Sequence, residues 1–375
     1  MKIRYKICLG LLFSTLFGVS KAEVRFNAKI IFPLSIELNK ISIEYHNGLQ
    51  IIPYKISTQS HIIEISDVYY SQYPVLIITY NTNDNIVTYP ERYFLEKKSE
   101  LTYFGNSKNN LDSVKLIRAY KVKDMGENQF DLFAKKELDN LTSFLFVNAK
   151  YINDSSLIFQ KFIELDVAVQ KKKLKFIQVN NKLYYSLWVF KEEFVSNIEY
   201  NADSLQQIYK QFFSTKFSNT FEAKLIVSVL NGRLNSFKDK TAPLFSARDF
   251  NGNKVELLKF RGEKYVILNF WASWCQPCIA EMPILDSINR CYSKKNVTII
   301  SVSQDRNRKK CLNAIQRFQM NWINIINDPI VNSAYGNNPA LPQVYLINKE
   351  GKIIYSRTDD KDYDLKKLYS IVEGL

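Results

Sequence analysis

The residues with the clearest chemical potential are two cysteines separated by two positions, Cys275 and Cys278. They follow an apolar run, Tyr265 to Phe270, that has the length and composition of a buried strand. A strand feeding a helix would place Cys275 at the helix N-terminus, where unpaired N–H groups and the helix dipole favour the nucleophilic thiolate. The spacing allows a disulfide between Cys275 and Cys278, and Pro277 suits a first helical turn. The pattern therefore predicts a redox-active dithiol.

A cysteine pair can also serve as a structural disulfide or as half of a zinc site. Zinc needs further cysteine or histidine ligands. The chain has only two histidines, His46 and His61, and the remaining C-terminal cysteines, Cys291 and Cys311, do not repeat the spacing of the pair. The lack of histidine also excludes Ser-His and Cys-His nucleophile pairs from the C-terminal three quarters. We expect no metal and no organic cofactor, and the structural disulfide stays open as an alternative.

The segment Asn269-Phe270-Trp271-Ala272-Ser273-Trp274-Cys275-Gln276-Pro277-Cys278 resembles the active site of the thioredoxin superfamily. Residues 240–375 are most similar to the extracytoplasmic TlpA/ResA-like thiol-disulfide oxidoreductases. The other matching segments are Ala242-Pro243-Leu244-Phe245, Lys259-Phe260-Arg261-Gly262-Glu263-Lys264 and Ala340-Leu341-Pro342-Gln343. The resemblance implies a cis Leu341–Pro342 peptide facing the cysteine pair. It also implies that Trp274, Leu341 and Pro342 bind substrate.

Two residues, Asn269 and Glu281, bear on proton transfer to and from the cysteine pair. Cytoplasmic thioredoxins carry a buried aspartate in the central strand, whereas this chain has Asn269, which cannot accept a proton. Glu281 lies about one helical turn after Cys278 and matches the active-site glutamate of ResA-like reductases. We expect Glu281 to take over proton transfer for Cys278, the alternative being an ordinary surface carboxylate.

The resemblance implies a reductase that transfers electrons to protein disulfides, for example in cytochrome c maturation or in envelope redox homeostasis. Its partners would be disulfide-bearing proteins and an upstream thiol electron donor, which a membrane could carry. A disulfide oxidase or isomerase is an alternative. A second alternative is an envelope binding protein in which residues 23–236 recognise the partner and the redox region is accessory. The sequence does not indicate an oligomeric state.

The N-terminus resembles a secretory signal. Residues 1–22 contain a basic start, a short apolar stretch and small residues at a cleavage position. We therefore expect an exported protein of the periplasm or cell envelope, with an uncleaved membrane anchor as the alternative. Removing the four basic residues of the signal lowers the net charge from +14 to +10. The remaining basic runs lack interleaved aromatic residues, so we expect no nucleic-acid partner.

Three regions follow the signal, and together they predict a multi-domain chain. Residues 23–126 alternate with period two and predict a β-sandwich-like domain of unknown function. Residues 127–236 contain no proline and predict a helical connector whose last helix ends before Gly232. Residues 237–375 alternate strands and helices, which predicts an α/β thioredoxin fold. The first two regions resemble the leader regions that precede TlpA-like domains in Bacteroidetes-type bacteria.

Cys291 and Cys311 lie outside the motif. We expect them to be buried thiols, with a secondary redox pair or a structural disulfide as alternatives. In the thioredoxin fold we expect their two helices to pack on opposite faces of the sheet, which argues against a bond between them.

Overall fold

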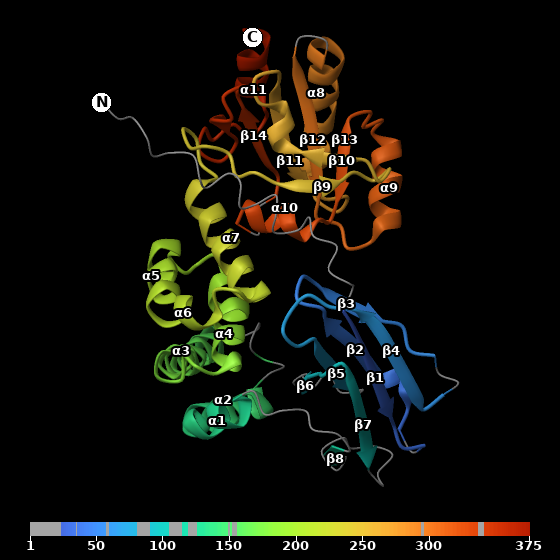
Figure 1. The fold of residues 1–375 in the computed structure, drawn as a ribbon, viewed down its shortest axis with the longest axis vertical. Helices are drawn as coiled ribbons and strands as arrows, with labels where there is room; N and C mark the ends of the chain where they lie inside the picture. Colours follow the sequence, from blue (N-terminus) through green and yellow to red (C-terminus); the bar gives the residue numbers. More distant parts are fainter. Residues whose placement is uncertain are drawn as a thin grey trace. The chain divides into compact units, whose positions relative to one another are not determined.

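The computed structural model describes residues 24–34, 36–57, 60–80, 91–104, 115–118, 126–148, 151, 156–293, 296–336 and 341–375. The predicted signal peptide, residues 1–22, lies outside these residues. The chain divides into two compact units (Figure 1). Of the described residues, the first takes in those of Ser20–Asn197 and Gln207–Lys224, and the second takes in those of Ile198–Gln206 and Leu225–Leu375. The helical residues are therefore shared between the units.

The first unit begins with two four-stranded sheets. One has the order β4-β1-β7-β8, in which β1 and β7 are parallel, and the other has the order β3-β2-β5-β6. The strands are β1 (Arg25–Ile31), β2 (Ile41–His46), β3 (Ile51–Tyr54), β4 (Ile62–Val68), β5 (Val75–Tyr80), β6 (Glu91–Phe94), β7 (Lys98–Phe104) and β8 (Lys115–Arg118).

The two sheets contact each other through aromatic side chains. The ring of Phe26 in β1 lies 5.4 Å from that of Tyr45 in β2, and the hydroxyls of Tyr103 and Tyr93 are 3.3 Å apart. Along β1 every second residue is buried, as the period-two pattern requires when one face of a sheet is covered. These contacts agree with the β-rich N-terminal region that the sequence predicts.

The middle of the chain is helical. Its elements are α1 (Glu127–Phe133), α2 (Lys135–Asn148), α3 (Ser156–Val179), α4 (Tyr184–Val189), a π-helix (Phe190–Val195), α5 (Ala202–Phe212), α6 (Ser214–Phe217) and α7 (Phe221–Asn235). Within the described residues, no helix is both long and apolar enough to cross a bilayer.

Gly232 lies inside α7, so the prediction that the helix ends before this residue is wrong. A Cβ at Gly232 would lie 2.4 Å from the carbonyl oxygen of Ala334 and 2.4 Å from the backbone nitrogen of Gly336. The glycine is therefore needed for a close approach between two backbones, and not for ending the helix.

The second unit contains a five-stranded sheet in the order β13-β12-β11-β14-β15. The strands β11, β12 and β13 are parallel, while β14 is antiparallel to both of its neighbours. The unit's strands are β9 (Ser246–Arg248), β10 (Lys254–Glu256), β11 (Tyr265–Trp271), β12 (Val297–Ser303), β13 (Ile323–Ile326), β14 (Gln343–Ile347) and β15 (Ile353–Ser356). Its helices are the 3-10 helix Leu257–Phe260 and α8 (Gln276–Tyr292), α9 (Arg308–Arg317), α10 (Pro329–Ala334) and α11 (Lys366–Glu373). This is the predicted α/β arrangement.

Two apolar cores cover the two faces of this sheet. The cysteine-side core contains Ile267 and Trp271 of β11 with the buried residues of α8, α9 and α11. The opposite core contains alternate residues of the same strand, such as Leu268, with the residues of α10. Because α8 and α9 share one core, the prediction that they lie on opposite faces of the sheet is wrong.

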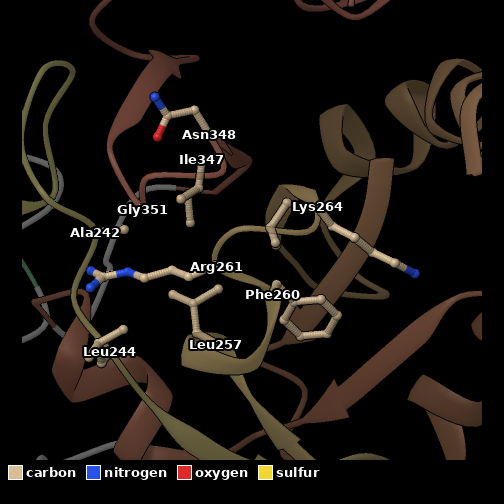
Figure 2. A pocket seen from close by; sticks show the side chains of 10 residues that line it. Ala242, Leu244, Leu257, Phe260, Arg261, Lys264, Ile347, Asn348 and Gly351 are labelled. Atoms are coloured by element: carbon tan, nitrogen blue, oxygen red, sulfur yellow. The ribbon is translucent and has the colours of Figure 1, made fainter. Parts of the chain in front are cut away.

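A small hollow lies in the opposite core (Figure 2). Its lining includes Leu244, Phe260 and the side chain of Arg261, and a Cβ at Gly351 would lie only 2.3 Å from the Arg261 Nε. All of its apolar lining belongs to the face of the sheet away from the cysteine pair. The hollow is therefore separate from the candidate active site.

Candidate active site

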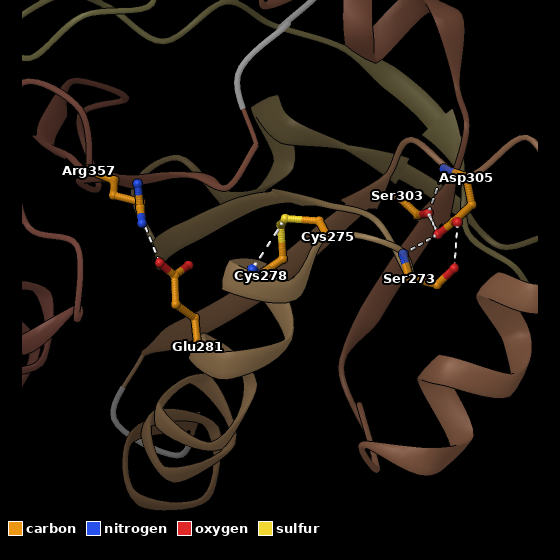
Figure 3. The surroundings of a disulfide bond; sticks show 7 residues. All are labelled: Ser273, Cys275, Cys278, Glu281, Ser303, Asp305 and Arg357. Carbon is orange, nitrogen blue, oxygen red and sulfur yellow. Dashed lines mark hydrogen bonds and ion pairs between the residues drawn. A yellow bond between two sulfur atoms is a disulfide. The ribbon is translucent and has the colours of Figure 1, made fainter.

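Cys275 and Cys278 form a disulfide at the start of α8 (Figure 3). The sulfur atoms are 2.01 Å apart and the Cα atoms 5.3 Å apart. Cys275 is the N-cap of the helix, and its sulfur accepts a hydrogen bond of 3.2 Å from the backbone N–H of Cys278. An N–H group aimed at sulfur, together with the helix N-terminus, favours negative charge on Cys275 once the bond is reduced.

The two cysteines are both buried, and Cys275 is slightly the more exposed residue. Cys275 is 6% exposed and Cys278 is 1% exposed. The neighbour of Cys275, Trp274, is 64% exposed, so a large apolar side chain lies open beside the more accessible cysteine. Exposed aromatic side chains of this size are well suited to contact a protein partner.

The Leu341–Pro342 peptide bond is cis, as predicted. Pro342 is buried and directly precedes β14, the strand that pairs with the central strand β11. Leu341 packs against both apolar cores. The predicted segment also includes Ala340, which lies outside the described residues.

Asn269 is buried on the cysteine-side face of β11 and is 1% exposed. Its side-chain amide donates a hydrogen bond of 3.3 Å to the hydroxyl of Ser301, which also accepts one of 2.7 Å from the indole N–H of Trp322. The amide that replaces the thioredoxin aspartate is therefore tied into a neutral polar network, and it cannot accept a proton from the pair.

Glu281 is 4% exposed, so it is not the surface carboxylate of the alternative reading. Its Oε1 accepts a hydrogen bond of 2.7 Å from Nε of Arg357, which lies just after β15. The other oxygen, Oε2, is buried and has no hydrogen-bond partner within the described part of the chain. Burial raises the pKa of Glu281 to about 7 although the Arg357 cation opposes the shift.

A second carboxylate lies on the Cys275 side of the disulfide (Figure 3). Asp305 is buried and follows β12. It accepts hydrogen bonds from the backbone N–H of Ser273 at 2.7 Å, from the Ser273 hydroxyl at 2.6 Å and from the Ser303 hydroxyl at 2.8 Å. Asp305 thereby holds the turn that leads into Trp274 and Cys275.

The other two cysteines of this unit are free thiols. Cys311 is buried as predicted, and burial raises the pKa of its thiol to about 11, which keeps it protonated and weakly reactive. Cys291 is exposed, so the prediction of a buried thiol is wrong there. It lies near the C-terminal end of α8, one residue before Tyr292, where the helix surface faces solvent.

No group of three or more histidine, cysteine, aspartate or glutamate side chains within the described residues is arranged to hold a metal ion.

The C-terminal part of the chain is similar to known proteins. A family model described as the AhpC/TSA family matches residues 239–356. The thiol-disulfide oxidoreductase ResA of Geobacillus thermodenitrificans is 35% identical over 141 residues, which make up 37% of this chain and 74% of that protein. The chain belongs to the ResA-like thiol-disulfide oxidoreductases.

Two further proteins are similar to part of this chain. ResA of a Bacillus thuringiensis strain is 37% identical over 116 residues, so the match spans 31% of this chain and 66% of that relative, just under two thirds of its length. The thioredoxin domain of a thiol-disulfide oxidoreductase from Bacteroides vulgatus is 29% identical, with a TM-score of 0.32, and covers 37% of this chain and 96% of that domain.

The sequence motifs locate the cysteine pair, Glu281 and Pro342, but not Arg357 or Asp305. Arg357 lies 76 positions from the carboxylate it contacts and belongs to no motif. Asp305 had a detectable signal, because polar residues at the carboxyl ends of parallel strands often contribute to a site in α/β folds.

Proposed function

We propose that this chain is an exported disulfide reductase that transfers two electrons from its Cys275–Cys278 dithiol to disulfides of other proteins. The observation that carries the proposal is the disulfide at the N-terminus of α8, in which the sulfur of Cys275, the more exposed of the two residues, accepts an N–H hydrogen bond. Reversible oxidation at such a position is the chemistry of thiol–disulfide exchange.

In the proposed reaction the reduced enzyme begins with a thiolate at Cys275 and a thiol at Cys278. The Cys275 sulfur attacks a substrate disulfide, a bond forms between the two chains, and the first substrate sulfur leaves as a thiolate and takes up a proton. Cys278 then loses its proton, attacks Cys275, and releases the second substrate sulfur as a thiol. Two electrons have passed to the substrate, and an external dithiol must restore the enzyme.

Glu281 is the proposed acceptor of the Cys278 proton. Its buried Oε2 has a free lone pair, and a carboxyl with a pKa of about 7 exchanges protons near neutral pH. Trp274, Leu341 and Pro342 are the proposed contacts for the substrate chain. Trp274 is largely exposed next to Cys275, and Leu341, which forms the cis bond with Pro342, packs against the core that contains both cysteines.

The export of the protein rests on residues 1–22, and its partners would be disulfide-bearing proteins and an upstream thiol donor. An oxidase would use the same residues but would take electrons from its substrate. An isomerase would use them with no net electron transfer. The reduction potential separates them, since known thiol–disulfide exchange proteins range from about −270 mV for a strong reductant to about −120 mV for a strong oxidant. We expect a value near the reducing end.

The test of the assignment is a trapping experiment with Cys278→Ser. Without the resolving sulfur, the variant should accumulate a mixed disulfide with a substrate protein through Cys275, visible on a non-reducing gel and located by mass spectrometry. Cys275→Ser is the matched control and should trap nothing. Trapping through Cys278 alone would reverse the two roles, and the absence of any mixed disulfide together with an irreducible Cys275–Cys278 bond would leave a structural disulfide.

A further inference from the structure

The buried ion pair between Glu281 and Arg357 has an unusual geometry. Both side chains are at least nine-tenths buried, with 5% and 10% of their side-chain surfaces exposed. An arginine can bind both oxygens of a carboxylate in parallel, and a pair that serves only packing gains most from doing so. Here only Oε1 of Glu281 is engaged, by Nε at 2.7 Å, while Oε2 is buried and unpaired within the described residues.

Arg357 is held in place from two sides. Its backbone N–H donates a hydrogen bond of 2.9 Å to the carbonyl of Val344, two residues after Pro342. Its guanidinium lies 5.1 Å from the centre of the Tyr363 ring. Tyr363 is largely exposed, whereas Arg357 is buried. These contacts, which do not involve Glu281, fix the arginine beside the cis-proline strand.

The orientation of Glu281 follows from this contact. In Figure 3, one carboxylate oxygen of Glu281 is turned toward Arg357 and the other lies on the side of the Cys275–Cys278 disulfide. A carboxylate on the second turn of a helix has several rotamers, and a charge-assisted hydrogen bond to a fixed arginine selects among them.

We propose that Arg357 is a positioning residue of this oxidoreductase, which holds Oε1 of Glu281 so that Oε2 faces the cysteine pair as the proton acceptor. The inference rests on the function proposed above and assigns a new residue to it. Arg357 touches neither the substrate nor the sulfurs in this arrangement and acts only through Glu281.

The charge of Arg357 has a second effect, on when Glu281 can accept a proton. The other ionisable groups that act on it are Asp362 and Tyr355, and the Tyr355 hydroxyl donates a hydrogen bond of 2.9 Å to Asp362. Asp362 and the burial of the site raise the pKa of Glu281, and Arg357 opposes both. Without the guanidinium the carboxyl would stay protonated to a higher pH and could not take the Cys278 proton near neutrality.

The experiment uses the full chain with Arg357→Gln. The Glu281 carboxyl is titrated by NMR, with its signal identified by its absence in Glu281→Gln, and kcat/KM for disulfide reduction is measured against pH. We expect the pKa of Glu281 and the rising limb of the kcat/KM profile to move upward together by about one pH unit or more. The matched control is Arg290→Gln on the same helix, whose partner Asp286 is near the surface, and it should move neither quantity.

Arg357→Lys keeps the charge but not the planar guanidinium, so it should shift the carboxyl titration less than Arg357→Gln while still lowering kcat. It also serves as the test if Arg357→Gln does not fold. An unchanged titration and pH profile in a folded Arg357 variant would overturn the proposal. If the wild-type chain reduced no disulfide at any pH, the proposed function would fail, and the carboxyl titration would still decide whether Arg357 sets the state of Glu281.

Discussion

At the residue scale, Glu281 combines two properties that folded proteins seldom bring together. It is a carboxyl group that is almost completely buried, and it carries one oxygen without a partner in the described structure. Burying an unpaired polar atom costs about 1–3 kcal/mol. Such a cost, one helical turn from Cys278, is consistent with the proton transfer that we propose for Glu281. Arg357 donates a hydrogen bond to only one of the two carboxylate oxygens, so the cost of burying the other oxygen is not offset.

This burial makes stability depend on pH. The pKa of Glu281 rises from an ordinary value of 4.5 to about 7 in the folded chain. The folded state therefore binds the proton more tightly than the unfolded state, so the stabilisation is fully present below pH 4.5 and is lost as the pH rises toward 7. The loss should be on the order of 3 kcal/mol, from about 1.4 kcal/mol per pKa unit.

The measurement is the free energy of unfolding in urea of the oxidised chain at several pH values between 4.5 and 8. Glu281→Gln cannot ionise, so the variant should gain stability relative to the wild type as the pH rises through this window. Asp286→Asn, a change at a more exposed carboxylate of the same helix, should not show this trend. If the difference in unfolding free energy between the wild type and Glu281→Gln stayed constant with pH, burial would not raise the pKa of Glu281 in the folded chain.

At the scale of helices and strands, local sequence signals work where they coincide with the tertiary structure. The mostly apolar strands β11, β12 and β14 are buried on both faces, so their apolar character alone predicts them. Strand β13 has only four residues at the edge of the sheet, too short for a periodic signal. The order of the strands in each sheet depends on long-range contacts. The parallel pairing of β1 with β7, for example, joins residues some 70 positions apart, which no local pattern encodes.

Gly232 shows how a local signal can point the wrong way. Replacing a glycine in the middle of a helix by alanine normally stabilises it by about 1 kcal/mol. In α7, however, the new Cβ would lie 2.4 Å from two backbone atoms of the segment Ala334 to Gly336, which cannot move aside as a side chain would. Gly232→Ala should therefore lower the free energy of unfolding by about 1–3 kcal/mol, as for overpacked interiors.

The matched control for this change is Lys224→Ala, an exposed position of the same helix. Its effect should stay within about 0.5 kcal/mol, as for surface substitutions. Urea denaturation of both variants measures the two effects. A Gly232→Ala variant as stable as the wild type, or more so, would mean that α7 and the Ala334 segment do not approach as closely as described.

At the scale of the whole molecule, the disulfide and the two buried carboxylates of the candidate active site all lie between Trp271 and Arg357. Every buried member of the two cores around the five-stranded sheet lies between Ala242 and Val372, and all partners of the sheet's strands lie there as well. The AhpC/TSA family model matches residues 239–356, within this same part of the chain. The sequence predicted the α/β class and the cysteine motif of this region because those signals are local, but it missed the contacts of Arg357 and Asp305. The predicted boundaries at 126 and 236 rest on composition alone, which reports secondary structure but not which unit a helix joins.

A truncated chain of residues 237–375 tests how far the site depends on the rest of the molecule. Because its cores and its sheet are complete, we expect it to fold, to form the Cys275–Cys278 disulfide and to reduce a small disulfide at the rate of the full chain. It loses the packing of Gly232 on Ala334, so its free energy of unfolding should be lower. Its Cys275→Ser variant is the inactive control. If the truncated chain reduces small disulfides normally but protein disulfides slowly, residues 23–236 recognise the substrate. If it is folded and inactive on both, the leader contributes to the chemistry itself, and the site described here is incomplete.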